Sequence, residues 1–347
     1  SAHEKLGKPL EWIIDRYAFS LRNNPKMVSS AAHQFGRDRA LIECFHSVGW
    51  SMTLQDAKWM IDRLAAFGIN FYNFHAFFFS VDGPRKHDAP PSQFLQNPYW
   101  PHFRKLADYA ARIAYAMSLG KPLANIAVLN PVATFRVHLG DYQHRLGYIG
   151  VDPAEQQRLE RYKESWSGIC KNLLLHRFDF DHLDPELLKE AQIRDGKIRL
   201  GNAEYDVLVL PPMSHIEAEA WERIGTFFRQ GGTVVCCGGR PARLIGGEAR
   251  EPFSVWPAPS PDAAMANGRW FDVPMPDGDE APHPLIAALR LAAPQAVRLM
   301  TEPDKSGLLL HARRLSDGSL IVFASNQEQQ PRRAVLELSP ERIRPSA

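Results

Sequence analysis

The sequence predicts an α/β protein with two strand–helix regions followed by a β-rich region. Three observations support this: short apolar runs alternate with amphipathic helical stretches, Gly or Pro follows most of these stretches, and a hairpin pattern stands near the C-terminus. Alternation of strands and helices implies parallel pairing of the strands. The expected regions are 1–122, 123–245 and 246–347.

The first region is predicted to contain consecutive βα units. Residues 39–45 form a short apolar run typical of a buried strand, and 69–75 form a second run that is rich in aromatic side chains. Between them, 54–67 has helical spacing with Thr53 as its expected N-cap. After a long loop that contains Gly and Pro, 100–119 is expected to be an amphipathic helix.

The second region has three clear strand patterns, at 125–130, 205–210 and 233–237. Helices are expected at 153–175 and 217–230. This alternation favours a doubly wound sheet of the flavodoxin type.

The third region begins with 245–279, which is rich in Pro, Gly, Ala and Asp and is expected to be a linker. Two apolar runs, 308–313 and 320–325, flank an Asp-Gly pair, which is a hairpin signal. Residues 334–338 are expected to form a third strand.

The size of these regions matters for the fold class. A closed eight-stranded barrel takes about 250 residues, and the first region has room for two or three strands. Three strands at the C-terminus cannot close a sandwich either. We therefore expect the chain to be a portion of a longer protein: the last strands of a (β/α)8 TIM-type barrel, a doubly wound domain, and the start of a β-rich domain.

Composition excludes few classes of function. The 347 residues are 45% hydrophobic and 23% charged, with a net charge of +2, which is ordinary for a globular protein and gives no case for nucleic acid. No apolar run is long enough to span a membrane. The four cysteines match neither a zinc pattern nor a disulfide framework. The chain begins Ser-Ala-His without a signal peptide, so the compartment stays open, as does the oligomeric state.

Glu43 is the candidate catalytic residue. It lies within the apolar run 39–45, one residue from its expected end. In (β/α) barrels the catalytic groups project from the C-terminal ends of strands, and a carboxylate there can act as nucleophile or base at the anomeric carbon of a sugar. The alternative is a structural glutamate that pairs with Arg16 or Arg39, or that meets solvent at the strand end.

The residues around Glu43 favour a sugar site. Sugars are bound by flat apolar faces combined with a few hydrogen-bonding groups. The alternatives are core aromatics, structural histidines and a solvated charge. The candidate substrate-binding residues are His33, His46, Trp50, Tyr72, His75, Arg85 and Trp100.

Cys236 and Cys237 end a predicted strand in the second region, where an elbow nucleophile would sit. A catalytic cysteine needs a histidine partner, and none follows until His283. We therefore expect both thiols to be dispensable for activity. The region has no nucleotide-binding GxGxxG or P-loop motif.

Several motifs resemble the end of the catalytic barrel in glycoside hydrolases of family 106, the α-L-rhamnosidase type: 29–36 (SSAAHQFG), 40–45 (ALIECF), 55–59 (QDAKW), and 68–71 (GINF) with His75. The segments 205–212 (YDVLVLPP) and 231–235 (GGTVV) are similar to the glutamine-amidotransferase-like domain that follows the barrel in that group. Family 42 β-galactosidases carry a similar domain.

The resemblance implies a hydrolase of O-glycosidic bonds with a carbohydrate substrate. Glu43 would be the active-site glutamate on the seventh barrel strand, and 69–75 would be the eighth strand. The partner carboxylate would come from an earlier strand, before residue 1, so this portion alone is expected to be inactive. No cofactor is required, although the resemblance allows calcium, for which no ligands can be placed.

Three alternatives stay open. Glu43 could be the base of an inverting mechanism or the nucleophile of a retaining one. The chain could belong to a β-galactosidase-like hydrolase of the family 42 type. It could also be a non-catalytic carbohydrate-binding or structural portion of a multidomain protein.

Overall fold

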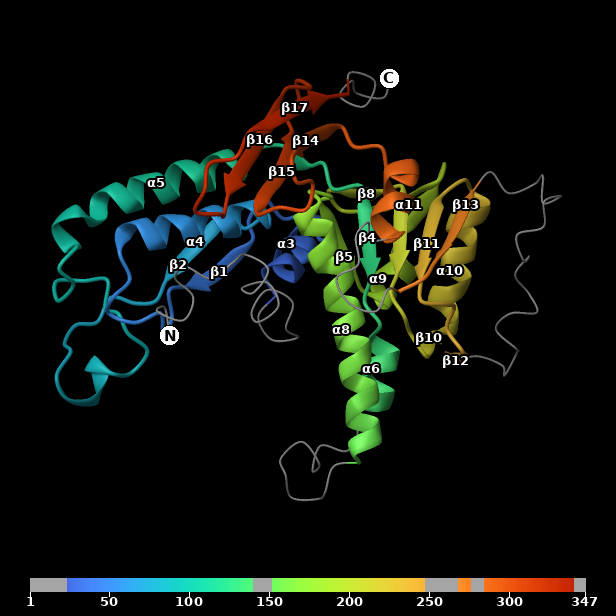
Figure 1. Ribbon diagram of the computed structural model, residues 1–347, viewed down its shortest axis with the longest axis horizontal. Helices are drawn as coiled ribbons and strands as arrows, with labels where there is room; N and C mark the ends of the chain where they lie inside the picture. Colours follow the sequence, from blue (N-terminus) through green and yellow to red (C-terminus); the bar gives the residue numbers. More distant parts are fainter. Residues whose placement is uncertain (1–23, 140–151, 247–267, 276–283, 340–347) are drawn as a thin grey trace. The chain divides into compact units, whose positions relative to one another are not determined.

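The computed structural model describes residues 24–139, 152–246, 268–275 and 284–339 (Figure 1). The chain divides into two compact units, Ser1–Leu123 with Ala296–Ala347, and Ala124–Gln295. The first unit is therefore made of two separate segments of chain. Within the described residues, no helix is long and apolar enough to cross a membrane.

The described part of the first unit begins with two capped helices and two strands. Helix α3 (Pro25–Gln34) begins after Asn24, whose side chain accepts a hydrogen bond from Lys26 N. Strand β1 (Leu41–Cys44) is followed by α4 (Leu54–Ala66) and β2 (Phe71–Phe74). Thr53 caps α4, as the sequence predicts, in a capping box with Asp56.

Strands β1 and β2 pair in parallel, which confirms the prediction for these two runs. The register places Ile42 opposite Tyr72 and Glu43 opposite Asn73. Because side chains alternate across a strand, one face carries Ile42, Cys44, Tyr72 and Phe74, and it packs into the core that includes Ile61 of α4.

The opposite face of β1 and β2 is exposed. Leu41 and Phe71, which are register partners, are 47% and 49% exposed. Glu43 and Asn73 continue the same face towards the carboxyl ends of the two strands and are exposed as well. The sheet thus has one packed face and one open face.

A long loop follows β2 and contains two short 3-10 helices, η2 (Gly83–Lys86) and η3 (Trp100–His102). Helix α5 (Phe103–Ala116) comes next and lies beside α4 (Figure 1). The predicted helix 100–119 is shorter at both ends, because its first turn is 3-10 and it ends at Ala116.

The C-terminal strands belong to the first unit. Strands β15 (Leu308–Arg314) and β16 (Leu320–Asn326) form the predicted hairpin, and β3 (Lys121–Pro122) pairs with β15. Strand β17 (Ala334–Leu338) pairs with β14 (Val297–Thr301), a strand that the sequence analysis did not predict. Helix α4 packs on the hairpin, so these strands group with 1–123 and not with the stretch before them.

The second unit is built on a five-stranded parallel sheet with the order β13-β11-β9-β4-β5. Its strands are β4 (Ile126–Leu129), β5 (Phe180–Leu183), β9 (Val207–Leu210), β11 (Thr233–Cys237) and β13 (Arg269–Val273). Numbered along the chain, the order is 2-1-3-4-5, which is one of the two common orders of doubly wound sheets. The predicted parallel pairing of three of these strands is confirmed.

Helices cover the sheet. Helices α8 (Pro153–Leu175) and α11 (Pro284–Ala292) contact one another, as do α9 (Pro185–Glu190) and α10 (Ala218–Arg229). The short helix α6 (Val132–His138) follows β4. Alternate side chains of β4, β9 and β11 enter the core with Ile224 and Phe227 of α10. The side chains between them are buried as well, so both faces of these strands are covered, which explains why the strands have no polar face.

Smaller strands complete the second unit. Strands β6 (Gln192–Arg194), β7 (Lys197–Leu200) and β8 (Ala203–Tyr205) form an antiparallel meander, and β10 (His215–Glu217) pairs in parallel with β12 (Arg243–Ile245). The predicted linker 245–279 contains β13, which is the edge strand beside β11, so part of this stretch belongs to the sheet. Residues 247–267 lie outside the described residues.

We predict that Thr53→Ala destabilises α4 by about 1 kcal/mol, because the cap of the helix is lost. The Thr53 hydroxyl accepts a hydrogen bond from Asp56 N at 3.2 Å. Hydrogen exchange of the α4 amides measures the effect. Thr53→Ser, which keeps the hydroxyl, is the control, and equal losses in both variants would contradict this role of the hydroxyl.

Candidate active site at the ends of two parallel strands

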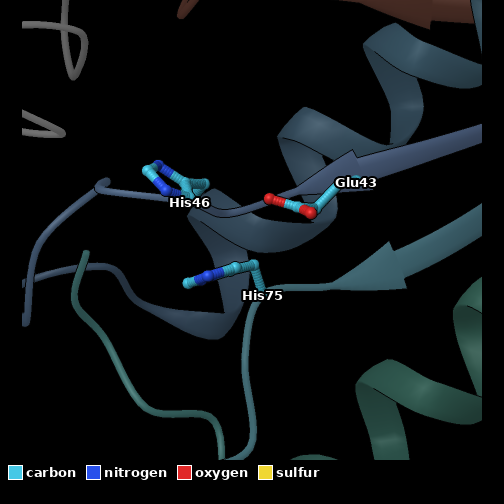
Figure 2. A group of neighbouring side chains, drawn as sticks. All are labelled: Glu43, His46 and His75. Atoms are coloured by element: carbon cyan, nitrogen blue, oxygen red, sulfur yellow. The ribbon is translucent and has the colours of Figure 1, made fainter. Parts of the chain in front are cut away.

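Glu43, His46 and His75 form a cluster at the carboxyl ends of β1 and β2. Their nearest ligating atoms all lie within 4.8 Å of one another (Figure 2). The imidazole rings of His46 and His75 are 4.5 Å apart between centroids. Glu43 and His46 are exposed and His75 is half-buried, so solvent reaches the cluster.

The parallel register creates this cluster. Both strands end at the same edge, and the N–H of His75 donates to Cys44 O at 2.9 Å, which extends the pairing by one residue. After Cys44 the chain turns sharply, with Phe45 and Ser47 in the left-handed region at φ 75° and 54°. Phe45 is buried against Phe74, and this anchors the turn.

Hydrogen bonds hold the two loops that follow the strands. Ser47 Oγ lies 2.9 Å from His46 Nδ1. Trp50 Nε1 donates to Lys86 O at 2.8 Å, which ties the loop after β1 to the 3-10 helix η2 in the loop after β2. Gly49 N donates to Pro90 O at 3.0 Å and adds a second tie.

The other predicted site residues lie elsewhere in the first unit. Trp50 is half-buried in the loop after β1, and Arg85 is exposed in η2, so both belong to the loops beyond the strand ends. Trp100 stacks on Phe103 at 5.7 Å and belongs to an aromatic group that includes Phe77 and Phe94.

The structure does not bring Tyr72 and His33 to the cluster. Tyr72 lies on the packed face of β2, opposite Ile42, and burial strongly raises its pKa. His33 is 3% exposed on α3, and its ring stacks on His311 of β15. A substrate contact by either residue stays a prediction, which the burial of His33 and the core-facing position of Tyr72 do not favour.

Asn73 is a residue that the sequence analysis did not single out. It is the register partner of Glu43 and is exposed on the same face. The alternation of side chains along 71–74 is the signal that could have found it, since Phe71 and Asn73 share one face and Tyr72 and Phe74 the other.

The donor set bears on which metal the cluster could hold. Calcium takes about 6–8 oxygen ligands, whereas this cluster offers two imidazoles and one carboxylate. The residues therefore do not fit the calcium that the family resemblance allows. Two histidines and one glutamate are instead a ligand set found in zinc sites.

The cysteines of the chain are not activated as nucleophiles. All four are buried. Burial, and then the charge of Glu43, raises the pKa of Cys44 to about 12. Burial, and then Asp272, raises the pKa of Cys236 to about 12, and burial raises that of Cys237 as well. A thiol with a raised pKa stays protonated near neutral pH and is a poor nucleophile.

No model of a protein family matches the chain. The solved structure of a rhamnosidase from Novosphingobium sp. PP1Y is similar over 90% of this chain and 28% of that chain, with a TM-score of 0.60 and 17% sequence identity. At this identity the likeness concerns the fold: the chain has a mixed α/β fold with a parallel sheet, shared with part of that rhamnosidase.

A curated protein of Formosa agariphila, named "Putative beta-glucuronidase", is 25% identical over 232 residues. The match covers 64% of this chain and 17% of that protein. The chain therefore spans about a sixth of this curated relative and less than a third of the rhamnosidase.

We predict that the four thiols do not react with a disulfide reagent in the folded protein at pH 8. Their pKa values are raised, so the reactive thiolate is scarce, and burial blocks access. The released thiolate chromophore measures the reaction, and the control in guanidinium chloride should titrate all four cysteines. Rapid reaction of any native thiol would contradict its protonated, buried state.

Proposed function

We propose that the chain carries part of the active site of a glycoside hydrolase, with Glu43 as an active-site carboxylate. The observation that carries this proposal is the position of Glu43, exposed at the carboxyl end of a parallel strand and clustered with His46 and His75. Catalytic groups of (β/α) barrels project from that end of the strands. The fold shared with a rhamnosidase supports the proposal, and so does the match to a protein named as a glucuronidase.

The open face of β1 and β2 supports a barrel in particular. Inward-facing side chains of a (β/α) barrel pack in layers with those of the other strands. We infer that Leu41 and Phe71 form such a layer beneath Glu43 and Asn73. Their exposure then has a simple reason, since the strands that would cover them are not among the described residues.

The finer assignment is an α-L-rhamnosidase-like enzyme. In this proposal β1 and β2 are the last two barrel strands, and the second unit is the flavodoxin-type, glutamine-amidotransferase-like domain that follows the barrel. The strand order of its sheet supports this assignment. A second carboxylate would come from an earlier barrel strand, because the cluster among the described residues holds only one.

Glu43 would act on the anomeric carbon. With a partner at about 5–5.5 Å it would be a nucleophile in a retaining reaction, and with one at about 6.5–9.5 Å it would activate water in an inverting reaction. The rings of His46 and His75 can donate or accept hydrogen bonds to sugar hydroxyls. Trp50 and Arg85, on the tied loops, would contact the sugar or the leaving group.

A second candidate is a non-catalytic carbohydrate-binding portion. The presence of a single carboxylate in the cluster favours it, since hydrolysis of a glycoside ordinarily needs two. In this case the same exposed histidines would bind a sugar that is not cleaved.

We predict that Glu43→Gln, in the complete protein, lowers kcat by about 10²–10⁴ or more and leaves sugar binding largely in place. The amide keeps the shape of the side chain but has neither charge nor basicity. Steady-state kinetics on aryl α-L-rhamnoside, β-D-galactoside and β-D-glucuronide measures the loss, and calorimetry with the product sugar measures binding.

Two variants serve as comparisons. Glu222→Gln removes an exposed carboxylate of α10 and should leave kcat unchanged. Trp50→Ala should mainly raise KM, because it removes stacking surface that ground and transition states share. A Glu43→Gln enzyme that keeps more than about a tenth of wild-type kcat would favour the binding portion, because the loss of a catalytic base ordinarily lowers the rate by about 10²–10⁴.

A further inference from the structure

The second unit contains a serine, a histidine and a glutamate joined in series by hydrogen bonds. His138 Nε2 lies 2.9 Å from Ser214 Oγ, and His138 Nδ1 lies 2.9 Å from Glu155 Oε2. Both distances are within the range of a nucleophile bound to its base and a base bound to its orienting group. These residues belong to a different compact unit from Glu43, and none of them is a residue of the proposed glycosidase site.

The topology of the sheet brings the three residues together. His138 ends α6, which follows β4, and Ser214 lies in the loop after β9, while Glu155 is in the first turn of α8. Strands β4 and β9 are neighbours, but the strand that follows β4 along the chain, β5, lies on its other side. The edge between β4 and β9 is therefore the switch point of the sheet, where α/β proteins bind ligands.

The Ser214 segment is fixed to α6. The backbone N–H groups of Ser214 and His215 donate to Thr134 Oγ1 at 3.1 and 3.0 Å, and the Thr134 hydroxyl donates to His215 O at 2.9 Å. Thr134 is fully buried. This arrangement positions the serine without using its own hydroxyl.

His138 and Glu155 are held as well. The ring of His138 stacks on Tyr162 at 5.4 Å, and its side chain is 12% exposed. Arg158 Nη2 lies 2.9 Å from Glu155 Oε1, so each carboxylate oxygen has its own partner. A base held by a carboxylate in this way keeps one ring nitrogen protonated and presents the other to the serine.

One consistent arrangement of protons follows. Glu155 accepts from Nδ1–H of His138, so Nε2 carries the lone pair and accepts from the Ser214 hydroxyl. His215 Nδ1 lies 2.9 Å from Ser214 Oγ. Burial is the main cause that lowers the pKa of His215, and the charge of Arg243 also lowers it, which favours the neutral ring; in that form Nδ1–H donates to the serine oxygen.

Solvent reaches this group, in contrast to the cysteines of the neighbouring strand. Ser214 and His215 are half-buried, and the Glu155 side chain is 38% exposed. Cys236 and Cys237, which end β11 at the same edge of the sheet, are buried. Ser214 is thus a half-buried hydroxyl beside an oriented imidazole at this edge, whereas the thiols are buried.

We propose that Ser214, His138 and Glu155 form a nucleophile–base–carboxylate triad that hydrolyses carboxylic esters. Ser214 Oγ attacks the carbonyl carbon while its proton moves to His138 Nε2, and that proton then passes to the departing alkoxide, which leaves as the alcohol. Water then attacks the acyl-serine while His138 Nε2 takes its proton, and that proton passes to Ser214 Oγ as the carboxylic acid leaves. Ester and water thus become acid and alcohol, and the serine and the histidine return to their starting protonation.

The site should turn over slowly. The N–H groups of Ser214 and His215 are bonded to Thr134, so neither is free to stabilise the oxyanion. General-base assistance by a positioned histidine is worth about 10²–10⁴, and labelling of Ser214 reports this assistance in the first step alone. Covalent labelling is therefore a sharper measure than turnover.

The experiment is labelling with a fluorophosphonate, followed by intact mass and peptide mapping, together with p-nitrophenyl acetate hydrolysis. We expect one adduct at Ser214, none in Ser214→Ala, and labelling slower by about 10²-fold or more in His138→Ala, since the base is lost. Ser319→Ala removes an exposed serine whose hydroxyl donates to Asp317 and should change nothing.

Glu155 is a positioning residue in this scheme. Glu155→Gln should slow labelling. Glu155→Asp keeps the charge and should be labelled faster than Glu155→Gln, whereas a purely structural contact would not make the rate depend on the charge. Ser214→Cys replaces the hydroxyl with a thiol at the same position, and the rate of its alkylation by iodoacetamide should fall when His138 is also replaced by alanine. Hydrogen exchange of β4 and β9 checks that each variant is folded.

Glu43→Gln should label like the wild type, so failure of this proposal is distinguishable from failure of the proposed glycosidase. An unlabelled Ser214 in the wild-type protein would overturn the triad. So would equal labelling rates in the wild type and a folded His138→Ala variant, because the histidine would then serve only to hold the loop.

Discussion

Parallel strand pairing is the constraint on which both sites depend. In the first unit, the register of β1 and β2 brings Glu43, His46 and His75 to one edge. In the second unit, the adjacency of β4 and β9 brings the segments of His138 and Ser214 to one edge. The carboxyl ends of neighbouring parallel strands lie at the same edge of the sheet. Strand pairing alone therefore brings together residues that are far apart in the sequence.

Packing then decides which side chains can act. On β2, Tyr72 enters the core while its neighbour Asn73 faces outward with Glu43. At the carboxyl edge of the second sheet, the two adjacent cysteines are buried, whereas Ser214 is in a loop beyond the strand. Chemistry at both edges therefore belongs to residues at or just past the last pairs of the sheet, as is general in α/β proteins.

Local signals in the sequence predicted the elements with strong patterns. The apolar runs at β1, β2, β4, β9 and β11 and the Thr53 cap of α4 are examples. Strand β13 was not predicted, because its apolar run is short, is bounded by Arg269 and Asp272, and lies within a Pro- and Gly-rich stretch. The pairing of β14 with β17 was not predicted, because it joins segments that are distant in the sequence.

Site residues were predicted where they lie at the end of a strand or follow it closely. Glu43, His46 and His75 were found in this way, but the strand face of Tyr72 and the burial of His33 depend on tertiary packing. Ser214 and His138 are 76 positions apart, and His138 and Glu155 are 17 apart. No local spacing marks such a group, because only the strand order of the folded sheet brings its members together.

The division of the first unit into two segments has a consequence for how the chain assembles. Closing a loop of the size of Ala124–Gln295 carries an entropic cost that grows with the logarithm of its length. The second unit is contiguous, so it can fold on the ribosome before β15 and β16 are synthesised. Once folded, its two ends lie close together, with Asn125 Nδ2 at 3.5 Å from Pro294 O. Strands β15 and β16 are then made close to β3. Folding of the second unit has by that point already offset the entropic cost of closing the loop.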